Sequence, residues 1–87
     1  MAMTMDGLAK LAEELGELQQ VVGKMMAYGT GNHPDGGKPL INRLEDEMAD
    51  VCAAIQFVSI TYQVNANYVQ ERGLEKLALF HKWHHED

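Results

Sequence analysis

The chain has 87 residues, a length that suits a single domain spanning residues 1–87. Acidic residues outnumber basic residues by 13 to 7, for a net charge of −6, and this balance argues against a protein that binds nucleic acid through its phosphates. The single cysteine, Cys52, cannot form an internal disulfide, and no apolar run is long enough to cross a bilayer. With no segment that resembles a signal peptide, the sequence predicts a cytoplasmic protein that does not enter a membrane.

The first predicted helix covers residues 4–28. Its apolar residues recur at spacings of three and four, the pattern of a heptad seam: Leu8, Leu11, Leu15, Leu18, Val22 and Met25. Thr4 or Asp6 is expected to cap its start, and the helix should end near Gly29.

A loop is predicted from about residue 29 to residue 39. This stretch contains four of the eight glycines and both prolines. Its length is near the upper end for a simple connection between two helices, and connections of this size often carry function.

Two further helices are expected after the loop. The second should begin near residue 39 or 40 and end between residues 62 and 64, with a seam of the same kind: Leu44, Met48, Val51, Ile55, Val58 and Tyr62. Cys52 lies at the edge of this seam and is interpreted as a small core residue. A third helix, from about residue 68 to residue 84, is expected to follow a break at residues 65–67 and to be interrupted at Gly73.

These elements predict an all-α fold, a helical hairpin plus a third helix. The signals of strands, alternation and β-branched runs, are missing from the sequence. Each long helix carries a seam, and one hairpin cannot cover both. The sequence therefore predicts a core of the four-helix-bundle type, formed by homo-oligomerisation.

Two acidic signatures stand on the two long helices. The first pairs Glu14 with Glu17, and the second pairs Glu47 with Asp50. Residues three apart share one face of a helix, so each signature presents two carboxylates side by side. If the helices pack together, the four carboxylates converge, and like charges at that distance repel unless a cation lies between them. Hard divalent cations such as Mg²⁺ prefer oxygen ligands of this kind.

Either signature alone is more simply interpreted as a solvated acidic face. The two together, each at the edge of a seam, favour a site, because a half-buried glutamate is costly unless it is paired or binds a metal. Nearby basic residues could neutralise the carboxylates or hold an anionic substrate: Lys10, Lys24, Arg43, Arg72 and Lys76.

The segments Leu-Ala-Glu-Glu-Leu-Gly-Glu-Leu, residues 11–18, and Leu-Glu-Asp-Glu-Met-Ala-Asp-Val, residues 44–51, resemble the MazG-type nucleotide pyrophosphohydrolases. This family belongs to the all-α nucleoside triphosphate pyrophosphatase superfamily, whose hallmark is Glu-Glu-x-x-Glu, a spacer, and Glu-x-x-Asp. The residues that fill these motifs are Glu13, Glu14, Glu17, Glu47 and Asp50. The resemblance covers about residues 8–83. The spacer is long for the family, and its extra length falls in the loop.

The resemblance implies hydrolysis of a nucleoside triphosphate to a monophosphate and pyrophosphate, with Mg²⁺ or, alternatively, Mn²⁺. The implied metal ligands are Glu14, Glu17, Glu47 and Asp50. Glu13 and Glu17 are the implied catalytic residues, with Glu13 beside the ligands or polarising the attacking water. The implied phosphate contacts are Lys24, Arg43 and Lys76, and the implied assembly is a homodimer or homotetramer.

Two alternatives remain at this point. Enzymes specific for dUTP or for phosphoribosyl-ATP belong to the same superfamily, and substrate choice depends on details of a pocket. A helical interaction module without catalytic activity, in which the acidic clusters are merely solvated, is the alternative of another class.

Overall fold

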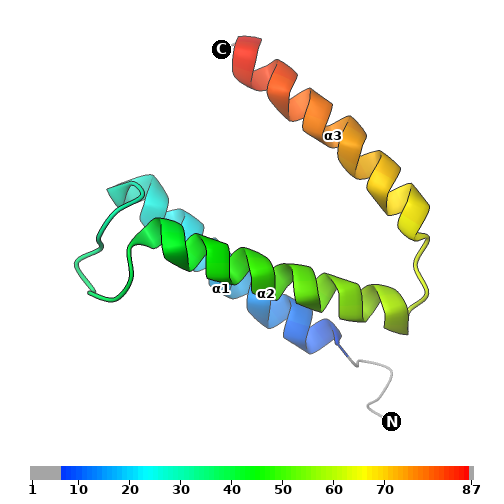
Figure 1. The fold of residues 1–87 in the computed structure, drawn as a ribbon, viewed down its shortest axis with the longest axis horizontal. Helices are drawn as coiled ribbons and strands as arrows, with labels where there is room; N and C mark the ends of the chain where they lie inside the picture. Colours follow the sequence, from blue (N-terminus) through cyan, green and yellow to red (C-terminus); the bar gives the residue numbers. More distant parts are fainter. Residues whose placement is uncertain (1–6, 87) are drawn as a thin grey trace.

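The computed structural model describes residues 7–86, which form three α-helices and no strand (Figure 1). Helix α1 spans Leu8–Tyr28, α2 spans Leu40–Thr61 and α3 spans Ala66–Glu86. This confirms the predicted all-helical class and the order of the elements. The caps predicted at Thr4 and Asp6 lie outside the described residues.

Glycines bound α1 at both ends. Gly7 precedes the helix in the left-handed conformation, with φ of 82°, and its carbonyl accepts a hydrogen bond from the Leu11 amide at 2.9 Å. A Cβ at this position would lie 2.7 Å from the ring of Phe57 on α2, so close helix packing also requires glycine here. Gly29 follows the helix, again with φ of 82°, and its amide donates to the Met25 carbonyl at 2.8 Å. This is a common way for a helix to end.

Helices α1 and α2 form an antiparallel hairpin and make the only extensive helix contact within the described part of the chain (Figure 1). The loop of residues 29–39 connects them, in the predicted place. Few hydrophobic side chains are buried in the hairpin, and together they make only a small core: Val21, Leu40, Val51 and Ala54. The interpretation of Cys52 as a core residue is wrong, because this side chain is exposed.

Helix α3 begins earlier and runs longer than predicted. The break between α2 and α3 covers residues 62–65, so Asn65 lies in it as predicted, whereas Ala66 and Asn67 are already helical. Asn65 also caps the helix, because its Oδ1 accepts the Tyr68 amide at 3.0 Å and its carbonyl accepts the Val69 amide at 3.0 Å. The helix also continues through Gly73, since one interior glycine weakens a helix by only about 1 kcal/mol.

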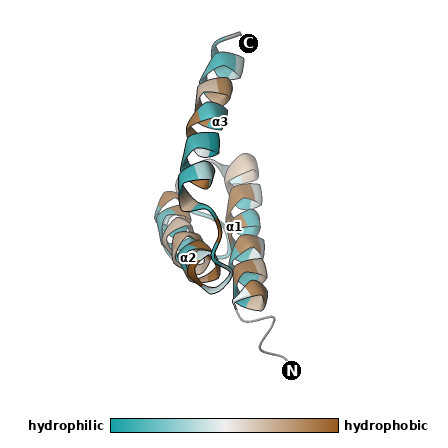
Figure 2. Ribbon diagram, turned by 90° about the vertical axis from the view of Figure 1, so that its right-hand side faces the viewer, coloured by the Kyte–Doolittle hydropathy of each residue, from teal (hydrophilic) through white to brown (hydrophobic). Residues whose placement is uncertain are grey.

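Helix α3 leads away from the hairpin instead of packing along it (Figures 1 and 2). The radius of gyration is 15.9 Å, whereas a compact domain of this length would have about 12 Å. Large apolar side chains of α3 are exposed in the single chain, among them Val69, Leu74, Leu77 and Phe80. Hydrophobic residues alternate with hydrophilic ones along α3, as they do along the two helices of the hairpin (Figure 2). None of the three described helices is apolar over the length that a membrane span requires.

Candidate metal centre

The two acidic signatures meet across the hairpin. Because α1 and α2 run in opposite directions, Glu14 of α1 lies opposite Glu47 and Asp50 of α2. One carboxylate oxygen from each of these three residues lies within 4.8 Å of the other two. We call these three residues the carboxylate cluster. It joins residues more than thirty positions apart in the sequence.

Two oxygens of the cluster are buried without a partner. Glu14 is the one charged residue that is buried among those described, with only 8% of the whole residue exposed. Its Oε1 atom and the Oε2 atom of Glu47 are both shielded from solvent and receive no hydrogen bond. A buried carboxylate oxygen without a donor or a cation is strongly unfavourable, so such groups are almost always paired or bound to metal.

The environment of Glu47 shows how crowded the cluster is. Burial raises the pKa of Glu47 to about 7, and the nearby carboxylates add to this, with Glu17 first and then Glu14 and Asp50. Glu17 is exposed, but it lies close enough to Glu47 to share a hydrogen bond with it. Near neutral pH the metal-free cluster is thus partly protonated, and a divalent cation would relieve the same repulsion. A donor set made only of oxygens fits Mg²⁺ or Mn²⁺.

Glu13 lies outside the carboxylate cluster. Its carboxylate accepts a hydrogen bond from the ammonium group of Lys10 at 2.7 Å, and its side chain is 55% exposed. The same ammonium group lies 3.6 Å from Oε2 of Glu14. Lys10 therefore pairs with Glu13 and partly neutralises Glu14. This ion pairing raises the pKa of Lys10, with the hydrogen bond from Lys10 to Glu13 as the main cause.

A pocket of about 350 Å³ opens beside Glu14 and Asp50. Its other lining residues come from the start of α1 and the middle of α2: Gly7, Lys10, Ala53, Ala54 and Phe57. One wall is therefore acidic and another is apolar. The sequence gives no local signal for Phe57, because its place in the pocket depends on how closely Gly7 lets α1 approach α2.

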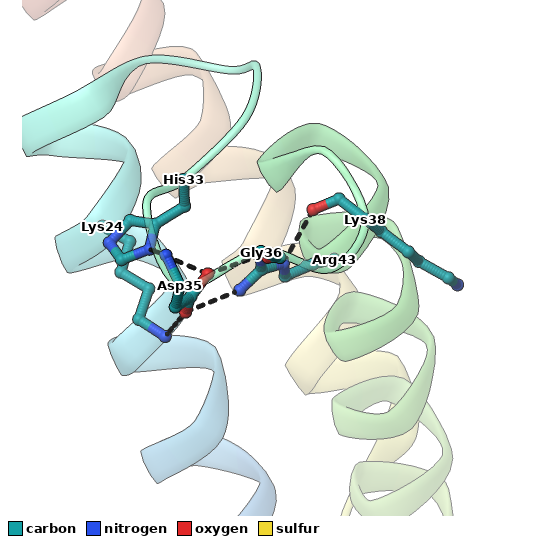
Figure 3. A network of polar contacts seen from close by, with 6 residues as sticks. All are labelled: Lys24, His33, Asp35, Gly36, Lys38 and Arg43. Carbon is teal, nitrogen blue, oxygen red and sulfur yellow. Dashed lines mark hydrogen bonds and ion pairs between the residues drawn. The ribbon is translucent and has the colours of Figure 1, made fainter.

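Lys24 and Arg43 come together at the loop end of the hairpin (Figure 3). Both bind Asp35, a loop residue that the sequence analysis did not single out. The ammonium group of Lys24 lies 2.9 Å from Oδ2 of Asp35, and the guanidinium group of Arg43 donates to both carboxylate oxygens, at 2.9 and 3.2 Å. No periodic spacing links residue 35 to residues 24 and 43, so only the path of the loop reveals this contact.

Lys76 is not brought to the carboxylate cluster within the single chain. It lies on α3, where its ammonium group is 5.9 Å from the centre of the Phe80 ring and 5.8 Å from that of Trp83. These are distances typical of cation–π contacts. Helix α3 carries Lys76 away from the hairpin (Figure 1).

Comparisons of the chain with protein-family models, with curated proteins and with solved structures find no match.

Proposed function

We propose that the chain is a nucleoside triphosphate pyrophosphohydrolase of the MazG type, which uses Mg²⁺ to release pyrophosphate and a nucleoside monophosphate. The observation that carries this proposal is the pair of buried, unpartnered oxygens of Glu14 and Glu47, both of which belong to the carboxylate cluster with Asp50. A solvated acidic face would expose these oxygens to water. Their burial favours a cation-binding role over the interaction module.

The side chains have separate roles in this proposal. Glu14, Glu47 and Asp50 hold the metal, and Glu17, which adjoins Glu47, completes the set. The bound ion would neutralise charge on the phosphates and orient a water molecule. Glu13 is exposed and paired with Lys10, so it has no place as a ligand in this proposal, and the role implied for it is to polarise that water.

The pocket gives space for the substrate beside the metal ligands. Its acidic wall would receive the metal-bound phosphates, and the apolar wall of Ala53 and Phe57 suits the flat face of a nucleobase. Lys24 and Arg43, which meet at the loop end of the hairpin, supply positive charge for the outer phosphates. Enzymes restricted to dUTP or to phosphoribosyl-ATP would use the same arrangement with a more selective pocket.

Self-association into a homodimer or homotetramer is part of the proposal. The hairpin buries few apolar side chains, while large ones stay exposed along α3: Tyr68, Val69, Leu74, Leu77, Phe80 and Trp83. An exposed apolar surface of this kind marks a protein interface, and a short chain gains the most from one. A core of the four-helix type would cover α3. It would also offer Lys76 a site on a second chain, which its own chain does not bring within reach.

The direct test is pyrophosphate release from a panel of canonical and modified triphosphates, with and without Mg²⁺. We expect metal-dependent release from the wild-type chain and a loss of at least about 100-fold in Glu47→Gln, because even residues that support metal ligands typically account for 10–100-fold. Glu75→Gln makes the same chemical change at an exposed position of α3 and should leave release unchanged.

A second readout does not need turnover. Millimolar Mg²⁺ should raise the melting temperature of the wild-type chain, because a ligand that binds only the folded state stabilises it by about 2.7 kcal/mol at 100 times its Kd. Glu47→Gln should keep its helical circular dichroism and lose this response. If no triphosphate and no phosphoribosyl-ATP were hydrolysed, and Mg²⁺ had no effect on melting, the enzyme would be excluded in favour of the interaction module.

A further inference from the structure

Asp35 is the centre of an ionic network at the tip of the loop (Figure 3). Its carboxylate binds Lys24 of α1 and Arg43 of α2 at the distances given above, and it lies 2.8 Å from Nδ1 of His33. When that nitrogen carries no proton, it accepts the Asp35 amide instead, at 3.0 Å. Three potentially cationic groups from three parts of the chain thus surround one carboxylate. The two permanent cations hold the pKa of Asp35 well below its usual range, with Arg43 as the main cause.

The guanidinium group of Arg43 is held in a fixed orientation. It donates to the carbonyl oxygens of Gly36 and of Lys38, the latter at 2.8 Å, and its side chain is only 19% exposed. A Cβ on Gly37 would lie 3.1 Å from Nη2, so the backbone packs directly against the group. The side chain of Lys38 points away from the network, toward Asp46 at 2.6 Å (Figure 3). A preorganised guanidinium that presents two parallel donors recognises a carboxylate or a phosphate equally well.

The position of the two cations suits a chain of phosphates. Arg43 precedes Glu47 by four residues on α2, and Lys24 follows Glu17 by seven on α1. Arg43 therefore lies on the same face of α2 as Glu47, and Lys24 on the same face of α1 as Glu17. The separation along the helix axis is on the order of 6 Å for the first pair and 10 Å for the second. A single small anion on the cations would not reach the carboxylate cluster, whereas a polyphosphate would extend to it.

The loop is fixed at its base, and its tip is held by the ion pairs of Asp35 and by the bonds from Arg43 to the Gly36 and Lys38 carbonyls. At the base, the Leu40 amide donates to the Gly31 carbonyl at 2.8 Å and the Ile41 amide to that of Thr30 at 2.9 Å. At the tip, one hydrogen bond joins two backbone groups: the Gly36 amide donates to the His33 carbonyl at 2.9 Å. Loss of the Asp35 ion pairs would therefore loosen the turn around His33 and Asp35, while the base of the loop and the start of α2 stay closed.

We propose that Asp35 is a built-in occupant of a phosphate site: it holds Lys24 and Arg43 in the free protein, and a bound polyphosphate displaces it and releases the tip of the loop. The exchange requires only a polyanion. That this anion is a nucleoside triphosphate rests on the proposed function. Asp35 thereby acts as a competing ligand. The apparent affinity for phosphate equals the intrinsic affinity multiplied by the fraction of time that Asp35 leaves the site open.

The test is the affinity for inorganic triphosphate, measured by NMR titration in EDTA so that neither metal nor turnover is involved. Removing the competing carboxylate in Asp35→Asn should tighten binding by about tenfold, the factor expected if Asp35 occupies the site about nine-tenths of the time. Asp46→Asn removes the same charge from an exposed ion pair outside the network and should leave the affinity unchanged. Equal or weaker binding by Asp35→Asn, or equal tightening in both variants, would overturn the proposal.

Amide hydrogen exchange in the wild-type chain tests the release of the tip without any substitution. Saturating triphosphate should speed exchange at the Asp35 and Gly36 amides and leave those of Leu40 and Ile41 unchanged. Unchanged or slower exchange at Asp35 and Gly36 would overturn the proposal even if Asp35→Asn disturbed the loop. Pyrophosphate release is a separate measurement, so the exchange can fail while the enzyme activity stands, and the reverse.

Discussion

At the scale of single residues, adjacent glutamates of α1 have opposite environments. The side chain of Glu13 is 55% exposed and that of Glu14 is 11% exposed, because consecutive residues of a helix point about 100° apart. Glu13 therefore finds the ammonium group of Lys10 in solvent, while Glu14 turns toward Glu47 across the hairpin. The difference between a surface ion pair and a candidate metal ligand is one step along the helix.

The raised pKa of Glu47 predicts that the metal-free protein loses stability as the pH rises through about 7. Burial, together with Glu17 and the cluster, raises this pKa to about 7, whereas an unfolded glutamate titrates near about 4.3. Between these values the folded state holds a proton that the unfolded chain has released. The stabilising contribution is therefore complete below about pH 4 and is lost as the pH passes through 7. The measurement is the melting temperature in EDTA between about pH 4 and pH 8.5, a range that covers both pKa values.

The control for this prediction is a pair of matched substitutions. Glu47→Gln cannot ionise and should flatten the decline, whereas Glu13→Gln, at the exposed neighbouring site, should keep the wild-type profile. A decline of equal size in Glu47→Gln would assign the pH dependence to groups other than Glu47.

At the scale of the elements, the hairpin depends on how closely its two helices approach. Gly7 permits the contact between the start of α1 and Phe57 of α2, and it adopts a left-handed conformation that other residues avoid. Leu40, at the first position of α2, is fully buried between the loop and the helices. Gly23, inside α1, has no atom within 4 Å of the place where a Cβ would lie.

Substitutions at these two glycines should therefore have opposite effects on the free energy of unfolding. Gly7→Ala should destabilise the fold by about 1–2 kcal/mol, from its positive φ and from the contact with the Phe57 ring. Gly23→Ala should stabilise it by about 0.5–1 kcal/mol, because alanine loses less backbone entropy in a helix. Urea denaturation of the two variants beside the wild type gives both values. A destabilising Gly23→Ala would show that this face of α1 is covered in the assembled protein.

At the scale of the whole molecule, the single chain is extended. Its extents are 42, 36 and 15 Å, with α3 projecting from the end of α2 (Figure 1). A helix with this many exposed apolar side chains is marginal in water without packing. The shape is understandable if a second chain covers α3.

Phe80→Glu tests the proposed assembly. Phe80 is 55% exposed in the single chain, so a charge here should cost little unless another chain covers it. In an assembly, each buried phenylalanine contributes about 1.5–3 kcal/mol, which predicts a rise of at least about tenfold in the dissociation constant. Light scattering after gel filtration gives the mass of each variant.

Asn67→Glu is the matched control, because it adds the same charge in the first turn of α3, where an acidic residue suits the helix dipole. It should retain the wild-type mass. A wild-type chain that is monomeric at micromolar concentration would contradict the homodimer and the homotetramer together.

The sequence alone determined the helices, the loop and the side-by-side placement of the two carboxylates within each acidic signature. These features follow from local periodicity and from glycine and proline, and they need no knowledge of distant contacts. Local signals were weakest around α3, where the predicted break extended to Ala66 and Asn67, which are helical, and where Gly73 does not interrupt the helix.

Only the tertiary structure decided which carboxylates are buried, which cations they meet and where α3 points. Glu14 and Glu47 lose their solvent because two helices pack against each other, and Lys24 and Arg43 share Asp35 because the loop folds back between them. Each of these contacts joins residues from different elements. Their geometry depends on packing distance and on the path of the chain, and no spacing along a single helix encodes either.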